Sequence, residues 1–246
     1  MLVAGISVYR AWKKLGGAEP AVLAGHSLGE YSALVASGAI SFADALPLVR
    51  FRAEVMQQAV PDGTGAIAAI LGLEDEQVRG LCAEQAQGEV LEAVNFNSPR
   101  QVVIAGHHPA VLRGIEAAKA KGAKRAVLLP MSVPAHCSLM RGAATQFKQR
   151  LQSVTLKTPR IQVIHNADLN THTQPEAIKD VLVRQLYNPV HWVAIIRALV
   201  QKGVTHIAEC GPGKVLAGLN KRIATGLDVT ALIDSNTLKQ ALIEIR

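Results

Sequence analysis

The sequence has little cysteine, few runs of charged residues of the same sign and no long apolar run. Its three cysteines, Cys82, Cys137 and Cys210, are odd in number and lack metal-ligand spacing, which argues against a disulfide framework and against a zinc site. We expect them to be reduced and mostly buried. No apolar stretch reaches the ~18 residues that a membrane span needs, and no basic segment precedes the apolar residues at the start. These features favour a cytoplasmic protein without a membrane partner.

Aromatic residues are also scarce, at 4% of the chain, and the basic residues that give a net charge of +7 are dispersed. Few aromatic platforms are therefore available to stack bases, which argues against a nucleic-acid partner. The positive charge suits an acidic small molecule or an acidic protein partner. A general contribution to solubility explains the net charge equally well.

A chain of 246 residues can bury a full core as one large domain or as a core with a smaller module. Over 61–131 the apolar spacing predicts the order βαββαβ, which is the ferredoxin-like arrangement. The expected strands are 66–72, 89–96, 100–106 and 124–130, and the expected helices are 74–88 and 108–122. We expect this unit to be inserted whole into a larger α/β domain formed by 1–60 and 132–246.

The flanking segments alternate helices with short apolar strands. The expected helices are 2–15, one beginning near 27, 41–60 with Ser41 as N-cap, 138–152, 175–187, 190–202 and one after 211–216. The expected strands are 21–25, 160–167 and 206–210, and no element is predicted beyond the helix after "GPGKVL". Strands separated by helices predict one mostly parallel sheet that is covered on both faces.

The stretch Gly25-His26-Ser27-Leu28-Gly29 joins an apolar strand to an amphipathic helix. Glycines let a strand turn into a helix within a few residues, so the serine lies on a strained turn with its oxygen exposed. The helix N-terminus directs backbone N–H groups, including that of Leu28, at whatever the serine oxygen attacks. The pattern indicates a nucleophilic serine, and the alternative is an ordinary strand-to-helix turn with Ser27 as N-cap.

Five stretches follow one another in a recognisable order: "GHSLGEYSALVASGAISFADAL", "VNFNSPRQVVIAG", "SVPAHCSLM", "VRQLYNPVHW" and "ECGPGKVLAGL". Together they resemble the malonyl-CoA:acyl carrier protein transacylases of bacterial fatty acid synthesis. The resemblance implies an α/β-hydrolase-like core with an inserted ferredoxin-like subdomain, in agreement with the division drawn from periodicity.

The resemblance also implies a catalytic set. His136 in "VPAHCSLM" matches the family's catalytic histidine, which would take the proton of Ser27 because a serine hydroxyl is a weak nucleophile on its own. Gln185 in "VRQLYNP" matches the residue whose backbone carbonyl replaces the aspartate of hydrolases and holds the histidine tautomer. The structural alternatives are a buried core histidine and a plain helix C-terminus before Pro189.

Three further residues are implied at the substrate. Arg52 in "LVRFRAEVM" matches the arginine that pairs with the free carboxylate of the malonyl group, since a guanidinium offers two parallel donors. His26 is expected among the substrate-binding residues, and Asn97 near the pantetheine arm. The alternatives are a solvated helix-face arginine at position 52 and a hairpin turn around Asn97.

The function implied is a two-step transfer of malonyl from malonyl-CoA to the phosphopantetheine thiol of an acidic acyl carrier protein, through a malonyl-serine. No metal and no redox cofactor is expected. One departure is that the family carries an additional N-terminal strand and a G-Q-G-S-Q stretch, whose first glutamine contributes to the oxyanion hole, and this sequence has no such stretch. The loss of one such donor costs on the order of 10²- to 10³-fold in rate.

Two other functions remain open at this point. A serine esterase or thioesterase would use an acid and a histidine in the order Ser, Asp, His, for which Asp168 or Asp180 with His191 or His206 qualify formally. A shortened chain that binds CoA or carrier protein without reacting is the other alternative.

Overall fold

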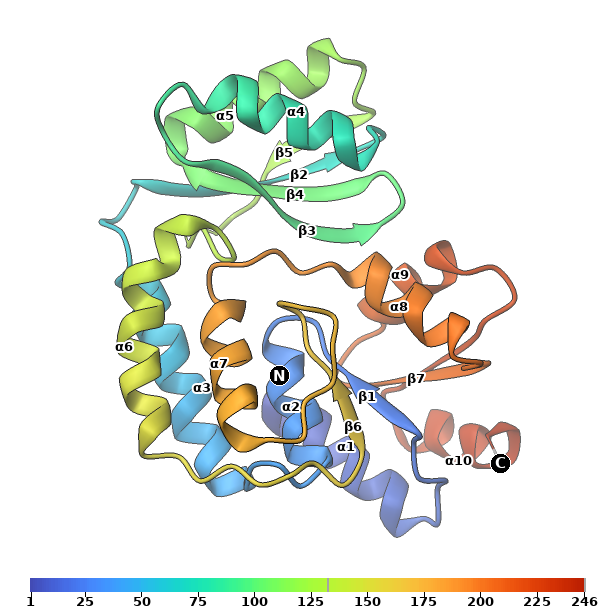
Figure 1. The fold of residues 1–246 in the computed structure, drawn as a ribbon. Helices are drawn as coiled ribbons and strands as arrows, with labels where there is room; N and C mark the ends of the chain where they lie inside the picture. The colour runs from blue at the N-terminus through green and yellow to red at the C-terminus, as the bar shows by residue number, and fades with distance from the viewer. Residues whose placement is uncertain (132, 246) are drawn as a thin grey trace.

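The structure is a computed structural model that describes residues 1–131 and 133–245. Ser132, at the expected boundary of the two segments, and Arg246 lie outside the described residues. The molecule has two parts, a core that holds both termini and a smaller part above it (Figure 1). The chain enters the smaller part after α3 and returns to the core after β5.

The smaller part is built from one sheet and two helices. Its elements are β2 (Gly65–Leu71), α4 (Asp75–Ala86), β3 (Leu91–Ser98), β4 (Gln101–His107), α5 (His108–Ala120) and β5 (Arg125–Leu128). The strand order is β3-β4-β2-β5, and every neighbouring pair is antiparallel. Both helices lie on the sheet face that points away from the core (Figure 1).

The other face of this sheet is buried against the core. Ile67, Val94, Val103 and Ala105 form one apolar cluster with Cys137, which belongs to the core. Successive residues of a strand point to opposite faces, so burial on both faces explains why these strands are nearly continuous apolar runs. The sheet thus supports the loop that carries Cys137.

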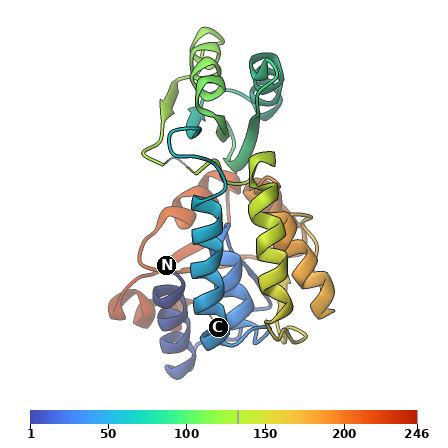
Figure 2. The same ribbon diagram turned by 90° about the vertical axis from the view of Figure 1, so that its left-hand side faces the viewer.

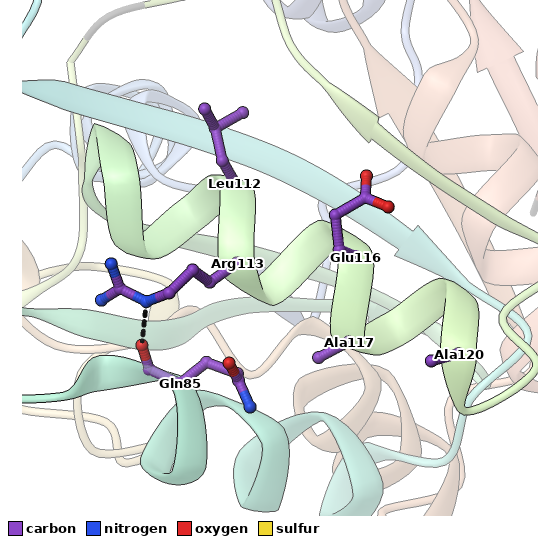
Figure 3. A pocket seen from close by; sticks show the side chains of 6 residues that line it. All are labelled: Gln85, Leu112, Arg113, Glu116, Ala117 and Ala120. Atoms are coloured by element: carbon purple, nitrogen blue, oxygen red, sulfur yellow. Dashed lines mark hydrogen bonds between the residues drawn. The ribbon is translucent and has the colours of Figure 1, made fainter.

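A shallow groove of about 560 Å³ lies between α4 and α5, and Figure 3 shows its lining residues. Arg113 crosses this groove. Its side chain donates to the carbonyl oxygens of Gln85 at 3.0 Å and Ala86 at 3.1 Å, the last two residues of α4. The same guanidinium pairs with Glu89 at 2.8 Å. This arginine is therefore engaged in holding the two helices together, on the side of the sheet opposite the core.

The core alternates helices and short strands. Its elements are α1 (Leu2–Lys14), β1 (Val22–Ala24), α2 (Leu28–Ala36), α3 (Phe42–Gln57), η1 (Ser138–Met140), α6 (Arg141–Gln152), β6 (Gln162–Ile164), α7 (Pro175–Gln185), α8 (Trp192–Gln201), β7 (His206–Cys210), α9 (Val215–Ile223), β8 (Asp228–Leu232) and α10 (Ser235–Glu244). Ser41 caps α3 as expected, because its side chain accepts from the Asp44 N–H at 3.0 Å.

The core strands differ from the single sheet predicted. They run parallel, but within the described residues they form two separate pairs, β1 with β6 and β7 with β8. Hydrophobic periodicity reports which residues are extended, whereas the pairing depends on which strand edges meet in space. The strand β8 and the helix α10 were missed, although Asp234 and Thr237 form a capping box at the start of α10.

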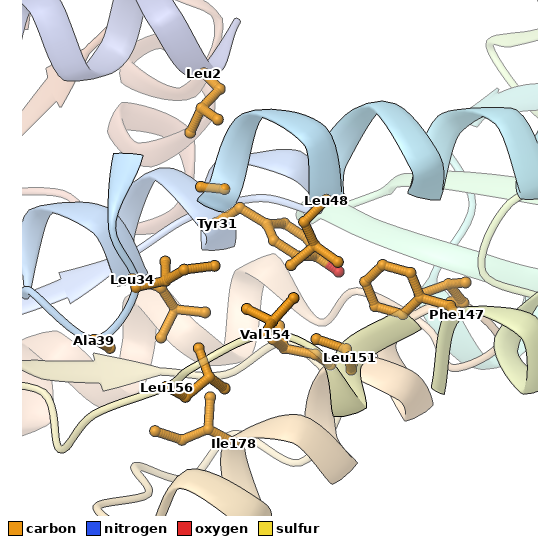
Figure 4. Packing of buried hydrophobic residues seen from close by; sticks show 14 of the residues in the cluster. Leu2, Tyr31, Leu34, Ala39, Leu48, Phe147, Leu151, Val154, Leu156 and Ile178 are labelled. Atoms are coloured by element: carbon orange, nitrogen blue, oxygen red, sulfur yellow. The ribbon is translucent and has the colours of Figure 1, made fainter. Parts of the chain in front are cut away.

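Helices α2, α3, α6 and α7 enclose the main apolar cluster of the core (Figure 4). Tyr31, Leu48, Phe147 and Ile178 are fully buried, one from each helix. Burying one such side chain stabilises the fold by about 1.5–3 kcal/mol. Figure 2 shows α3 and α6 side by side along one side of the core. This packing fixes the N-terminus of α2, where Ser27 lies.

Among the residues described, no helix combines the length and apolar character that crossing a membrane requires. Cys82 and Cys137 are buried and Cys210 is partly buried, and all three are free thiols.

Candidate active site

The turn between β1 and α2 holds Ser27 in an unusual backbone conformation. Its φ is 50° and its ψ is −106°, a combination that costs on the order of 1–3 kcal/mol and persists only where the surroundings enforce it. Gly25 permits the tight turn, because a Cβ there would lie 2.0 Å from the backbone carbon of Gly29. The structure therefore has the strained strand-to-helix turn that the sequence predicted.

His136 contacts the Ser27 hydroxyl directly. Its Nε2 lies 2.8 Å from Ser27 Oγ, and its Nδ1 lies 2.8 Å from the backbone carbonyl oxygen of Gln185. A carbonyl oxygen can only accept, so Nδ1 carries the proton and Nε2 accepts from the hydroxyl. The structure brings Ser27, His136 and Gln185 together in the order in which the sequence analysis linked them.

The His136 ring is buried, and that burial favours its neutral form. Burial, followed by the positive charge of Arg52, lowers the pKa of His136 to about 3. The imidazole is therefore neutral at pH 7 and has a free nitrogen available for a proton. The backbone of His136 lies in the left-handed region, with a φ of 67°, and its backbone N–H donates to Leu186 O at 3.0 Å.

Arg52 reaches the same point from α3. Its Nη2 donates to Ser27 Oγ at 3.0 Å and to the side-chain oxygen of Gln185 at 3.0 Å. The residue is buried, and its Nε has no hydrogen-bond partner among the described residues. A cleft of about 540 Å³ opens beside it, with Leu28, Leu46 and Val49 among the lining residues. A largely buried guanidinium whose residue lines a cleft suits an anionic ligand.

His26 and Asn97 join the two parts of the molecule. Asn97 Oδ1, from β3 of the smaller part, lies 2.8 Å from His26 Nε2 on the turn next to Ser27. Burial lowers the pKa of His26, so this ring is also held neutral and donates to the amide oxygen. The backbone of β3 continues the contact, with Phe96 N donating to Val190 O at 2.9 Å. Both predicted substrate residues therefore lie where the smaller part meets the Ser27 turn.

The family described as "Acyl transferase domain" matches residues 1–228. The malonyl CoA-acyl carrier protein transacylase of Escherichia coli (strain K12) is 52% identical over 242 residues, which cover 98% of this chain and 78% of that protein. The chain belongs to the malonyl-CoA:acyl carrier protein transacylase family.

Solved structures of this transacylase family have the same fold. An acyl-carrier-protein S-malonyltransferase from Burkholderia pseudomallei 1710b gives a TM-score of 0.97 at 54% identity, covering 98% of this chain and 79% of that chain. A type II PKS acyl-carrier protein in complex with its malonyl-transacylase gives a TM-score of 0.97 at 47% identity, covering 99% of this chain and 79% of that chain. The α/β fold of the transacylases is thereby established for this chain.

The acid and histidine pairs of the esterase alternative make their hydrogen bonds elsewhere. Asp168 pairs with His172 at 2.9 Å and with Arg184 at 2.9 Å, and Asp180 pairs with Arg184 at 2.7 Å. The two histidines of that alternative have other partners, because His191 stacks on Phe96 and His206 contacts Thr230. The position that an esterase acid would occupy, beside His136 Nδ1, holds the Gln185 carbonyl instead. The contacts of these four residues therefore do not support the Ser-Asp-His alternative.

Three polar side chains close to Ser27, those of Glu30, Asn166 and Gln185, were not predicted to lie there. Glu30 is fully buried, Asn166 accepts from the Ser27 N–H at 2.7 Å, and the Gln185 side chain donates to Ser27 O at 3.0 Å. A signal existed for Glu30, because it precedes Tyr31 on the apolar side of a short helix where a charge is costly without partners. No group of three or more metal-ligating side chains occurs in the described part of the chain.

Proposed function

We propose that this chain transfers the malonyl group of malonyl-CoA to the phosphopantetheine thiol of an acyl carrier protein, through a malonyl ester of Ser27. The observation that carries this proposal is the continuous contact from Ser27 Oγ to His136 Nε2 and from His136 Nδ1 to the Gln185 carbonyl, each at 2.8 Å. Membership of the transacylase family supplies the substrate class.

In the first step, Ser27 Oγ attacks the thioester carbonyl carbon while His136 Nε2 takes the hydroxyl proton. The Gln185 carbonyl stabilises the imidazolium through the Nδ1 proton. Leu28 begins α2, and its N–H is one of the first four of the helix, which have no partner within the helix. We assign this N–H to the developing oxyanion. The C–S bond then breaks, and CoA leaves as a thiol with the proton from His136.

In the second step, the thiol of the carrier protein gives its proton to His136 and attacks the malonyl ester. The C–O bond breaks, Ser27 regains its proton, and malonyl thioester forms on the carrier. The first thiol product leaves before the second thiol reacts with the acyl-enzyme, so the mechanism predicts ping-pong kinetics. We propose that His26 and Asn97 contact the pantetheine arm, because they lie where the smaller part meets the Ser27 turn.

Arg52 is proposed to select substrates that have a free carboxylate. Its two contacts, to Ser27 and to the Gln185 side chain, use neutral acceptors, so a carboxylate in the cleft is a stronger partner. An acetyl group leaves that cation without its partner. Buried polar groups left unpaired are what produce large discrimination between substrates.

Arg52→Ala is expected to lower kcat/KM for malonyl-CoA by about 10²- to 10³-fold, the usual cost of removing one partner of a buried charge pair. Acetyl transfer should change much less. The measurement is carrier acylation with each thioester, followed by mass spectrometry. Arg150→Ala, an exposed arginine on α6, is the control for a change in net charge. Equal losses for malonyl and acetyl would refute the selectivity role.

The finer architecture is also a proposal. The order β2-α4-β3-β4-α5-β5 and the strand order β3-β4-β2-β5 support a ferredoxin-like subdomain over about 61–131. The strand–Ser27–helix turn supports an α/β-hydrolase-like core in 1–60 and 132–246. We further propose an acidic carrier surface, which suits the net charge of +7, and a cytoplasmic location, which suits three free thiols.

The experiment that tests the function mixes the chain with malonyl-CoA in the presence and absence of a holo acyl carrier protein. We expect malonyl to appear on the carrier, and malonyl-CoA hydrolysis without the carrier to be slow. Hydrolysis as fast as transfer would support a thioesterase. Binding of malonyl-CoA without an adduct and without transfer would support a chain that binds but does not react.

A further inference from the structure

The carboxyl group of Glu30 lies at the centre of a buried polar cluster behind the Ser27 turn. Its Oε1 is 2.7 Å from His165 Nδ1, and its Oε2 accepts from Asn166 N at 3.0 Å and from Gln185 Nε2 at 2.7 Å. Glu30 and His165 have no exposed side-chain surface. Three nitrogen groups around two oxygens form the arrangement that a carboxylate accepts. Nothing in the two-step transfer uses this group.

Two of these partners hold the backbone of the nucleophile. Asn166 accepts from the Ser27 N–H at 2.7 Å and donates to Gly25 O at 2.8 Å. Gln185 Nε2 donates to Ser27 O at 3.0 Å while it also donates to Glu30. The N–H and the carbonyl of Ser27 are therefore each held by an amide side chain, that of Asn166 and that of Gln185. Glu30 in turn contacts the backbone N–H of Asn166 and the side chain of Gln185. A serine with a φ of 50° needs such restraint, because its conformation is otherwise unfavourable.

The same cluster fixes which way the Gln185 amide points. Its nitrogen faces Glu30 and Ser27 O, so its oxygen faces Arg52, which donates to it at 3.0 Å. Without Glu30, this amide nitrogen loses the nearer of its two acceptors, which leaves Ser27 O alone to hold it. The Arg52 Nη2 that donates to this amide oxygen also donates to Ser27 Oγ, at 3.0 Å.

We propose that Glu30 is a positioning residue, which acts through Asn166 and the Gln185 side chain to hold Ser27 in its reactive conformation. The inference rests on the proposed function, since it concerns the rate at which Ser27 is acylated. It assigns the Gln185 side chain a role separate from that of its backbone carbonyl. A misplacement of about 1 Å at a reacting atom costs on the order of 10²-fold in rate.

The variants Glu30→Ala and Glu30→Gln separate positioning from charge. Alanine removes all three contacts. Glutamine keeps them, because its oxygen can accept from Asn166 N and Gln185 Nε2 while its nitrogen donates to His165 Nδ1 in the other tautomer. Leu151→Ala is the matched control for lost stability, because Leu151 is buried in the same domain on α6 and lies in the apolar cluster.

The measurement is the single-turnover rate of malonyl-Ser27 formation, by intact-mass spectrometry over a range of malonyl-CoA concentrations, at a temperature where every variant is folded by circular dichroism. For Glu30→Ala we expect the saturated rate to fall about 10²-fold, with the half-saturating concentration changed by less than about threefold. Glu30→Gln should stay within about tenfold of the parent chain, and Leu151→Ala within about threefold.

Equal rates for Glu30→Ala and Leu151→Ala would overturn the inference while leaving the proposed function intact. So would a Glu30→Gln variant as slow as Glu30→Ala, because charge rather than positioning would then be responsible. If Glu30→Ala does not fold, Asn166→Ala tests the same link to Ser27, and we expect at least about a tenfold slower saturated rate. An unmodified parent chain would refute the proposed function and the inference together.

Discussion

Ser27→Ala is expected to abolish the malonyl adduct and to lower transfer by about 10⁶-fold, the order of loss seen when an activated serine is removed from a comparable catalytic set. In the proposed mechanism the Ser27 oxygen forms the ester, and His136 Nε2, 2.8 Å away, takes the hydroxyl proton. Intact-mass spectrometry after brief incubation with malonyl-CoA measures the adduct, and peptide mapping locates it.

Ser32→Ala is the matched control for this experiment, because Ser32 lies on the same helix, α2, as the residues that follow Ser27. That variant should keep one adduct at the parent rate. An adduct that persists in Ser27→Ala would place the nucleophile elsewhere and contradict the proposed mechanism. The absence of any adduct on a well-folded parent chain would favour the form that binds without reacting.

His136→Ala is expected to slow the formation of malonyl-Ser27 by about 10⁴- to 10⁶-fold, since the serine then has no base. The measurement is the single-turnover rate of adduct formation. His206→Ala is the matched control, because His206 belongs to the esterase alternative and contacts Thr230. Loss of activity in His206→Ala with retention in His136→Ala would contradict the assignment.

The pH dependence of acylation provides a second measurement of His136. Protonation of Nε2 removes the base, and burial lowers the pKa of His136 to about 3, so the rate should be nearly constant between about pH 5 and 8. A tenfold fall centred near pH 6.5 would contradict a buried, neutral imidazole. The same pKa shift makes the fold lose stability as the pH falls from about 6.5 towards 3, because the unfolded chain binds that proton first.

The strained turn at Ser27 was predicted from the sequence, whereas the pairing of the core strands was not. Ser27 could be found before the fold was known because the residue types of its turn favour a nucleophilic serine, and His136 could be found through the resemblance to the transacylases. The sheet of the core could not, because β1 pairs with β6 and β7 with β8 through strand edges that residue patterns do not encode. The two-faced burial of β2 explains why a continuous apolar run still predicted a strand there.

The contacts behind Ser27 were missed for a different reason. Gln185 was expected only through its backbone, whereas its side chain also contacts Ser27, Glu30 and Arg52. A polar residue at a helix end is usually exposed, so its type gives no sign of such burial. Asn166 lies after a three-residue strand, and only the three-dimensional path of the chain brings it to the Ser27 turn.

The residues around the nucleophile are far apart along the chain. His136 lies 109 residues after Ser27, and Gln185 lies 158 residues after it. At a synthesis rate of about 5–20 residues per second, roughly 8 to 30 s separate the appearance of Ser27 from that of Gln185. During this interval Ser27 lacks two things. His136 is not yet held by the Gln185 carbonyl, and the Gln185 side chain does not yet contact the Ser27 backbone. The hydrogen bonds to Ser27 can therefore be complete only after residue 185 has been made.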